Sequence, residues 1–398
     1  MDLDLLKLFG TLRPYGSRTN DRLFLRSIKR RAAYFIKHSP EYRAICEDAG
    51  FHPAVLKNMK SLEQIPVIPT LYFKRNKIGI RRGPAVEVTS SGTGGTASRL
   101  SYSVWEICLL AAMAVNLGRI HGLFSRRPVH YIMLGYQPSK ENKAVISKTA
   151  WLSTLYAPAI SRRYALEYRK GVRGESGTYT LNLPGILENL ARCAEGTHPV
   201  RLVGFPSYTY FLLKKMKQEN IICRLPGDSR VMLGGGWKQF EKEEIPKEEL
   251  YTLIWEVLGI NKTRVHEFFG AAEHPVLYCS CKNHHFHIPA YARVLIRDTE
   301  TLEALPKGRA GLVNLLTPIG SDLPLMSVMT DDIGVLHDKK ECGCGIKSDY
   351  LEILGRTGAK GIRTCAAGAA DYWNITSGKI AENRAVQAAN SPVVYKIK

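Results

Sequence analysis

The sequence predicts an α/β fold, and three patterns along the chain predict it. Before residue 75 the chain has the pattern of helices joined by proline-containing turns. From residue 85 to 270 short apolar runs of strand length alternate with amphipathic helical segments, which is typical of α/β layers. After residue 270 turn residues separate one strand-like run from the next. We therefore expect a helical N-terminal segment, a layered α/β core and a strand-rich C-terminal part.

Each element of the core follows from its local pattern. The stretch "SYSVWEICLLAAMAVNLGRIHGL" has the apolar residues of a buried helix, and "RVMLGGG" is an apolar run that leads directly into glycines. Apolar runs of about eight residues indicate strands, while runs with a polar face indicate helices. In order, the predicted elements are helix 101–123, strands 129–136 and 198–205, helix 207–220, strand 230–236, helix 247–260, and strands 287–298, 310–318 and 331–338.

The chain is basic, with a formal charge of +20 and a pI near 9.5. A basic surface attracts phosphates, nucleic acid or an acidic protein. Short clusters such as Arg126-Arg127 and Arg162-Arg163 are spread along the chain, and no nucleic-acid-binding signature accompanies them. We therefore expect no nucleic-acid partner, and each cluster is either a solvated surface or a contact for a polyphosphate ligand or an acidic protein partner.

The sequence also argues against a membrane or exported protein and against a protein built on a disulfide framework. No apolar run reaches the length of a membrane span, and the N-terminus lacks the small-residue cleavage pattern of a signal peptide, so we expect a cytoplasmic protein without a membrane span. Nine cysteines without an export signal argue against a disulfide framework. Four of them have apolar or helical surroundings and are predicted to be small core residues: Cys46, Cys108, Cys193 and Cys223.

The stretch "VTSSGTGGTASRL" packs eight Ser, Thr and Gly residues into the nine positions from Thr89 to Ala97. Glycines let backbone N–H groups turn toward one point, and hydroxyls add donors, which suits a phosphate at the mouth of the predicted helix. The alternative is a flexible linker, which more often separates independently folding units.

A second group of residues has the chemistry of a metal site. "YCSCKNHHFHIPA" supplies Cys279, Cys281, His284, His285 and His287, and "ECGCGI" supplies Cys342 and Cys344. Thiolates with an imidazole favour zinc, and four such ligands close a tetrahedral structural site. The preferred set is Cys281, His287, Cys342 and Cys344, with Cys279 as a substitute for Cys281. The alternative is two hairpins that carry unpaired cysteines in a reducing compartment.

Five polar or glycine-rich clusters recur in order, where α/β folds bind ligands at strand ends. They are the Ser/Thr/Gly loop, "LGGGWK" at 233–238, "EFFGAAEHP" at 267–275, "TDDIG" at 330–334 and "LGRTGAK" at 354–360. Their order and spacing resemble the adenylate-forming superfamily of acyl and aryl ligases over residues 85 to 365. "SSGT…G", "GGGWK" and "C-x-CG…LGR" are most similar to its acyl-protein synthetase and phenylacetate-CoA ligase branches. The metal-ligand set also resembles the Cys/His/Cys/Cys pattern of some phenylacetate-CoA ligase relatives.

The resemblance implies ATP and Mg²⁺ as cofactors and assigns a role to each matching residue. The loop residues would bind the β- and γ-phosphates, three glycines would lie against adenine beside an aromatic ring, and an acidic residue would hold magnesium. An aspartate would accept hydrogen bonds from the ribose hydroxyls. A basic residue would lie near the ribose and the phosphate. The loop is Ser90, Ser91, Gly92, Thr93, Gly94, Gly95 and Thr96; the adenine residues are Gly234, Gly235, Gly236, Phe269 and Gly270; the others are Glu273, Asp332 and Arg356.

The chain departs from the family pattern at two places. Many relatives have Pro and Lys after the loop, where this chain has Ala97, Ser98 and then Arg99, so the catalytic cation is expected one position later, at Arg99. Ala272 stands before Glu273 in place of the usual Thr, which removes one hydroxyl from the phosphate region.

The C-terminal end carries the last prediction. Adenylate-forming ligases usually have a mobile C-terminal domain of about a hundred residues, whereas 42 residues follow Arg356 here. We expect a short C-terminal segment, 356–398, in place of that domain, after a helical segment, 1–75, and an adenylate-forming core, 76–355. Acyl-protein synthetases are similarly short and pass their acyl group to a cysteine in this part of the chain, which makes Cys365 the candidate.

The predicted function is ATP-dependent activation of a fatty or aryl carboxylic acid to an acyl-adenylate, followed by transfer to a thiol. The thiol acceptor is the chain's own, that of a carrier protein, or CoA. An acyl- or aryl-CoA ligase is the alternative within the enzyme class. A catalytically degenerate nucleotide-binding partner protein is the alternative outside it, because Ala272 and the short C-terminal segment both allow that function.

Overall fold

The structure is a computed structural model that describes residues 2–16, 18–75, 80, 85–89, 98–139, 145–171, 177–356 and 394–396. The chain forms two compact units. Unit 1 comes from Met1–Ser90, Thr96–Leu123 and Phe269–Lys360, and unit 2 from Ser91–Gly95, Phe124–Phe268 and Gly361–Lys398. The predicted phosphate loop, Ser90–Thr96, and Cys365 lie outside the described residues.

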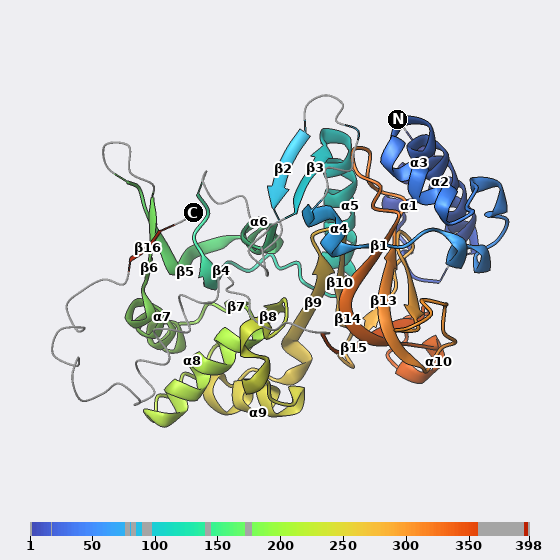
Figure 1. The fold of residues 1–398 in the computed structure, drawn as a ribbon. Helices are drawn as coiled ribbons and strands as arrows, with labels where there is room; N and C mark the ends of the chain where they lie inside the picture. The colour runs from blue at the N-terminus through green and yellow to red at the C-terminus, as the bar shows by residue number, and fades with distance from the viewer. Residues whose placement is uncertain are drawn as a thin grey trace. The chain divides into compact units, whose positions relative to one another are not determined.

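Unit 1 combines the N-terminal helices with an antiparallel sheet of order β11-β15-β14-β13-β12, to which β1 adds in parallel beside β14. Helices α1 to α3 lie alongside this sheet (Figure 1), and the Phe9 ring of α1 stacks on Tyr291 at 4.7 Å. The helices and 3₁₀ turns are α1 Leu3–Phe9, α2 Arg18–His38, α3 Pro40–Asp48, η1 Pro53–Val55, η2 Lys60–Gln64, α4 Thr70–Arg75, α5 Val104–Ile120 and α10 Lys339–Cys342. The strands are β1 Ile68–Pro69, β2 Ala85–Thr89, β3 Arg99–Ser103, β10 His274–Cys279, β11 Phe286–His287, β12 Arg293–Arg297, β13 Ala310–Leu316, β14 Ser327–His337 and β15 Tyr350–Arg356.

Unit 2 is built on a sheet in which β9, β8, β7, β4 and β5 run parallel and β6 and β16 extend it antiparallel. Its strands are β4 Val129–Tyr136, β5 Ala159–Arg169, β6 Thr178–Leu181, β7 Val200–Gly204, β8 Arg230–Gly234, β9 Val265–Ala271 and β16 Val394–Lys396. Its helices and 3₁₀ turns are α6 Val145–Leu152, η3 Ser153–Tyr156, α7 Leu183–Glu195, α8 Pro206–Gln218, η4 Lys238–Glu243, α9 Lys247–Leu258 and η5 Lys262–Arg264. The last residues of β9, from Phe269, belong to unit 1.

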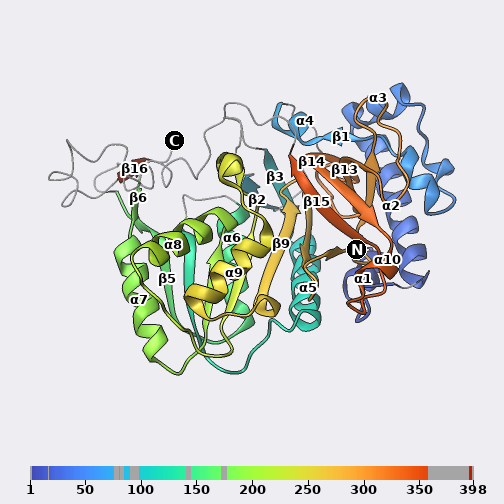
Figure 2. The same ribbon diagram turned by 90° about the horizontal axis from the view of Figure 1, so that it is seen from below.

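The core of unit 2 lies between one face of this sheet and helices α7, α8 and α9, which cover that face (Figure 2). Ile132, Leu202 and Val231 are in register on adjacent strands, and all three are buried. They pack with apolar residues of the three helices in one hydrophobic cluster. The helix and strand patterns of the sequence therefore meet on a common apolar face, as α/β layers require.

Most of the predicted elements are confirmed, and the helix predicted over 101–123 begins later than expected. Residues 99–103 form β3, which pairs with β2, so the Ser/Thr/Gly loop is followed by a strand. The helix α5 starts at Val104, because the Ser103 hydroxyl accepts from the Glu106 amide while the Glu106 carboxylate accepts from the Ser103 amide. The helix is also only partly buried, since Val104 and Val115 are exposed.

The cysteine predictions are correct for three residues and wrong for one. Cys46, Cys193 and Cys223 are buried, whereas Cys108 is exposed on α5. Cys108 lies on the face of α5 that also carries the exposed Val104 and Ile107, so apolar neighbours in sequence did not mean burial. Within the described residues, no helix combines the length and the apolar character needed to cross a membrane.

Candidate functional site

Glu273, the predicted magnesium ligand, lies in the turn between β9 and β10 and is held there by β3. The Glu273 side chain is buried, and Ser98, directly before β3, donates a hydrogen bond of 2.5 Å from Oγ to Glu273 Oε1. The Tyr102 hydroxyl donates to the carbonyl of Ala272 at 2.9 Å. Ser98 therefore holds the carboxylate itself, and Tyr102 of β3 holds the backbone of the turn that carries it.

Two residues near Glu273, His274 and Tyr102, are neutral at neutral pH. Burial lowers the pKa of the neighbouring His274 to about 3, so this imidazole is neutral and does not neutralise the carboxylate. Burial, with smaller contributions from Glu106 and Glu273, raises the pKa of Tyr102 well above its usual value, so Tyr102 remains a hydrogen-bond donor. A buried carboxylate with neutral donors around it suits a hard divalent cation such as Mg²⁺.

Asp332 and Arg356, predicted to act near the ribose, are brought together by the sheet of unit 1. They are register partners on β14 and β15, and Arg356 Nε lies 2.9 Å from Asp332 Oδ1. Burial raises the pKa of Asp332, and the Arg356 charge and the Thr330 hydroxyl partly oppose that rise. The Asp332 carboxylate is buried while Arg356 is 39% exposed, so the pair presents a carboxylate oxygen beside a cation.

The two other residues predicted for the adenine site in unit 1 lie at the end of β9. The Phe269 ring is half-buried, with the rings of Tyr278 and Phe286 both 5.8 Å away, centroid to centroid. Gly270 is exposed, and a Cβ at this position would lie 3.3 Å from the carbonyl oxygen of Val276, a close approach that glycine permits. A fixed aromatic ring beside an exposed glycine fits the stacking role that the resemblance implies.

The glycine segment Gly234–Gly236 belongs to unit 2 and ends β8. Gly235 has φ of +78°, a left-handed conformation that glycine adopts without strain. A Cβ added at Gly234 or Gly236 would meet no atom within 4 Å, so the space beside both residues is open. These glycines therefore form a sharp exit from the strand with room for a flat ring against the backbone.

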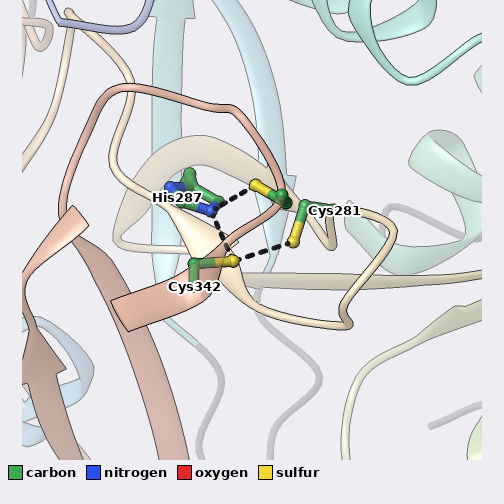
Figure 3. A group of neighbouring side chains, drawn as sticks. Cys281, His287 and Cys342 are labelled. Atoms are coloured by element: carbon green, nitrogen blue, oxygen red, sulfur yellow. Dashed lines mark hydrogen bonds between the residues drawn. The ribbon is translucent and has the colours of Figure 1, made fainter. Parts of the chain in front are cut away.

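The predicted metal ligands converge in unit 1. Ligand atoms of Cys281, His287, Cys342 and Cys344 all lie within 4.8 Å of one another, and Figure 3 shows three of these side chains pointing to one centre. His287 Nε2 is 3.2 Å from Cys342 Sγ and 3.1 Å from Cys344 Sγ, and the sulfurs of Cys281 and Cys342 are 3.6 Å apart. Zinc bonds of about 2.0–2.3 Å in a tetrahedron separate ligand atoms by about 3.5–3.8 Å, close to this spacing.

The local backbone explains this convergence. Gly343 and Gly345 have φ of +68° and +96°, so the chain curls around each cysteine of "CGCG". The backbone N–H of Ile346 donates to Cys344 Sγ at 3.3 Å. His287 Nδ1 lies 2.7 Å from the carbonyl oxygen of Ser348, which orients Nε2 toward the sulfurs as in protein metal sites.

Two details of the cluster differ from, or go beyond, the sequence pattern. Cys279, the substitute considered for Cys281, ends β10 and lies outside the group of converging ligands. His285 was one of several histidines in the pattern, and its Nδ1 is 3.1 Å from Cys342 Sγ while its ring stacks on Tyr350 at 4.3 Å. The sequence reasoning also missed Ser98 and Tyr102, because nothing in their spacing indicates contacts with a turn 170 residues away.

Arg99, the predicted catalytic cation, is exposed on β3, directly after the buried Ser98. The described residues thus bring together three groups: Ser98 with Glu273, Asp332 with Arg356, and the four metal-ligand candidates.

Comparison with known proteins identifies the family of the chain. The profile of the acyl-protein synthetase family LuxE matches residues 14–372. The long-chain-fatty-acid–luciferin-component ligase of Vibrio harveyi is 24% identical over 372 residues, 92% of this chain and 92% of its own. The ligase of the same name from Aliivibrio fischeri is 25% identical over 344 residues, 85% of each chain.

A solved structure has a fold similar to that of this chain. An open conformation of 2-hydroxyisobutyryl-CoA ligase, in complex with 2-HIB-AMP and CoA, has a TM-score of 0.62 and 17% identity, and the match covers 87% of this chain and 76% of that chain. The predicted fold of an adenylate-forming ligase and the predicted resemblance to acyl-protein synthetases are confirmed. Because the family profile matches most of its length, the chain is a ligase that belongs to the acyl-protein synthetase family LuxE.

Proposed function

We propose that this ligase uses ATP to activate a long-chain fatty acid and passes the acyl group to a thiol. The observation that carries the proposal is the buried Glu273, held by Ser98 at the end of the predicted phosphate loop. The acid class follows from the names of the two relatives, which are ligases of long-chain fatty acids. The family match over residues 14–372 supports the same activity in this chain.

The reaction has two steps. A carboxylate oxygen of the acid attacks the α-phosphorus of ATP, the bond to pyrophosphate breaks, and an acyl-adenylate forms. A thiolate then attacks the acyl carbon, the bond to the AMP oxygen breaks, and a thioester and AMP are released. In the first step two anions approach each other, so the site must offset their repulsion.

We assign the phosphate region to the loop Ser90–Thr96, with Arg99 as the cation and Glu273 as the magnesium ligand. Magnesium bound there supplies positive charge to the phosphates of ATP. Glu273 is suited to this role because it is buried, precedes a neutral His274 in the chain and is fixed by Ser98. Arg99 is suited because it is exposed directly after Ser98.

We assign the nucleoside region to two sets of residues. Asp332 accepts hydrogen bonds from the ribose hydroxyls, and Arg356 beside it faces the phosphate, since their ion pair keeps a carboxylate and a cation adjacent. The resemblance assigns adenine contacts to Gly234, Gly235 and Gly236 of unit 2 and, separately, to Phe269 and Gly270 of unit 1. The open space beside Gly234 and Gly236 supports this role.

The Cys281, His287, Cys342 and Cys344 cluster is proposed to hold one structural zinc ion. The donor set is that of zinc, the separations fit a tetrahedron, and the carbonyl of Ser348 orients His287. Four protein ligands leave no open position, so zinc would stabilise the fold and take no part in the reaction.

The acceptor is proposed to be Cys365, in a short C-terminal segment of a cytoplasmic enzyme, as the resemblance to acyl-protein synthetases implies. A carrier-protein thiol and CoA are the alternative acceptors, and an acidic protein partner would suit the +20 charge.

The test is ATP–pyrophosphate exchange with a chain-length series of fatty acids and with aryl acids. Exchange that depends on magnesium and is fastest with long-chain acids is the expected result. Absence of exchange with every acid, in protein that binds ATP, would show a degenerate nucleotide-binding protein. Adding CoA then separates a CoA ligase from an acyl-protein synthetase, because only the former converts CoA to a thioester.

A further inference from the structure

Three apolar side chains of the helix α6 and the 3₁₀ turn η3 of unit 2 are exposed, while one serine and one threonine of the same elements are buried. Trp151, Leu152 and Leu155 are 41%, 50% and 59% exposed, whereas Ser147 and Thr154 are 6% and 1% exposed. A surface helix of a globular protein normally has the opposite arrangement. Side chains of this kind grouped on an outer face mark an interaction site.

Phe124 extends this apolar face, which we name the α6 surface and define as Phe124, Trp151, Leu152 and Leu155. Phe124 is 49% exposed, and its ring lies 5.3 Å from that of Tyr156 at the end of η3. The Ser125 amide donates to the Tyr156 carbonyl at 3.0 Å. The segment before β4 is therefore fixed against the end of η3, the element that carries Leu155.

Basic residues flank the α6 surface. Arg126 follows Phe124 by two positions, and Arg162 donates from Nε to the Thr154 hydroxyl at 3.0 Å, next to Leu155 in the chain. Arg162, Arg163, Arg126 and Arg127 are all exposed. Among the described residues between 124 and 163 the basic ones are Arg126, Arg127, Lys148, Arg162 and Arg163, and none is acidic. Arg127 lies 3.7 Å from Asp228, so Arg126, Arg162 and Arg163 carry most of the charge argument.

We propose that the α6 surface binds the surface of an anionic lipid bilayer. Tryptophan, phenylalanine and leucine beside arginine and lysine are the residues of helices that lie in the bilayer interface. The local positive charge complements anionic lipid headgroups. An acidic protein would satisfy the arginines, but it would not by itself account for the exposed apolar side chains of α6 and η3, elements that bury a serine and a threonine.

Membrane attachment would also suit the substrate. Long-chain fatty acids partition into bilayers, so an enzyme at the interface meets its acid at a higher local concentration. The argument from the substrate rests on the proposed function. Lipid binding itself does not rest on that function, because lipid binding is measured without acid or ATP. A failure of lipid binding therefore leaves the exchange assay of the proposed function unaffected.

The experiment is co-sedimentation of the full chain with vesicles of phosphatidylcholine alone or with about 30 mol% phosphatidylglycerol. The variants are Leu152→Asp combined with Leu155→Asp, and Arg162→Glu combined with Arg163→Glu. Trp255→Ala is the matched apolar control, since Trp255 is 52% exposed on α9 of the same unit. Lys29→Glu, at an exposed position of α2, is the matched control for charge. Thermal unfolding checks that each variant is folded.

The wild-type chain is expected to bind the anionic vesicles, and less so as salt is raised. The aspartate variant should lose binding by about tenfold or more, because two apolar side chains no longer insert. The glutamate variant should lose the preference for phosphatidylglycerol, and both controls should bind like wild type. Absence of vesicle binding, or equal binding by the aspartate variant, overturns the proposal. Dimerisation that Leu155→Asp abolishes, or binding to poly-glutamate without binding to vesicles, also overturns it.

Discussion

Ser98 Oγ donates a 2.5 Å hydrogen bond to Glu273 Oε1, and both side chains are buried. The two residues are 175 positions apart, and they connect the end of the predicted phosphate loop with the predicted magnesium ligand. A buried carboxylate loses its hydration, so a nearby donor is needed to offset that cost. Ser98 is therefore a positioning residue for Glu273, and the hydrogen bond can be tested from both ends.

Replacing Ser98 with alanine removes the donor and leaves the acceptor buried. We expect Ser98→Ala to lower the free energy of unfolding by about 1–3 kcal/mol, the cost of leaving a buried polar group without its partner. Urea unfolding at neutral pH measures this loss. The variant should also need more magnesium for pyrophosphate exchange, because the carboxylate is no longer held in one position.

The variant Glu273→Gln separates the effect of the hydrogen bond on stability from the effect of the carboxylate charge on magnesium binding. The amide oxygen can still accept from Ser98, so the stability should stay near that of the wild type, while the charge that binds magnesium is gone. Exchange activity should therefore fall far more in Glu273→Gln than in Ser98→Ala. Equal exchange activity in Glu273→Gln and wild type would remove Glu273 from the magnesium site.

Asp332 predicts a pH dependence of stability. Burial raises its pKa in the folded chain above the value of about 3.9 in an unfolded chain. Between these two values the folded state binds more protons than the unfolded state, so the free energy of unfolding falls as pH rises through this window. The loss then persists to neutral pH. Asp332→Asn cannot titrate, so we expect its stability relative to wild type to increase from acidic to neutral pH.

Urea unfolding of both proteins across this pH range checks the sign. A wild-type chain that gains stability over Asp332→Asn as pH rises would show that the Arg356 ion pair outweighs the cost of burial. ATP affinity is the second measurement. Because Asn has one acceptor oxygen and no charge, Asp332→Asn should bind ATP more weakly even where it is the more stable protein.

The metal cluster predicts one zinc ion per chain. Cys342→Ser should reduce the zinc content of purified protein and lower its melting temperature, because the ion ties Cys281 and His287 to a segment about 55 residues later. Elemental analysis measures the content. Cys279→Ser is the matched control, since Cys279 is buried nearby but lies outside the cluster, and it should retain zinc. Zinc-free wild-type protein prepared without chelator would refute the site.

The sequence predicted the parts of the fold that depend on local patterns. The strands at 129–136 and 230–236 and the helix at 247–260 were found because apolar periodicity is a property of consecutive residues. It misplaced the start of α5, because the strand β3 is defined by pairing with β2, a partner outside the pattern. It expected Cys108 in the core for the same reason, since burial depends on what packs against a helix.

In the candidate site, too, features set by short motifs were predictable and features set by the tertiary fold were not. The convergence of the four candidate metal ligands was predictable because thiols and imidazoles in short motifs have few other uses together. Asp332 and Arg356 were predicted through the resemblance, but their ion pair follows from the register of β14 and β15. The hydrogen bond between Ser98 and Glu273 was not predictable, because serine is common and its contacts depend on the tertiary fold. The roles of these residues, and the division into segments 1–75, 76–355 and 356–398, stay predictions.

Cys365 decides which acceptor this ligase uses. It lies outside the described residues, nine positions after Arg356 in the sequence, so a short segment could deliver it to an acyl-adenylate near that residue. Lys360 and Arg363 precede it, and their positive charges favour the thiolate that attacks the acyl carbon. We expect the chain to form a thioester on Cys365 after incubation with ATP, magnesium and an accepted fatty acid.

Intact-protein mass spectrometry measures this acylation. The acyl mass should appear in wild type, disappear after hydroxylamine treatment, and be absent from Cys365→Ser. Cys108→Ser is the matched control, because Cys108 is an exposed cysteine that an acyl-adenylate released into solution would reach, and this variant should be acylated like wild type. A Cys365→Ser variant that still forms the thioester would place the acceptor elsewhere in the chain. AMP release with acyl transfer to CoA alone would instead identify a CoA ligase. An enzyme that acylates its own cysteine must carry the acyl group on the protein before any second thiol receives it.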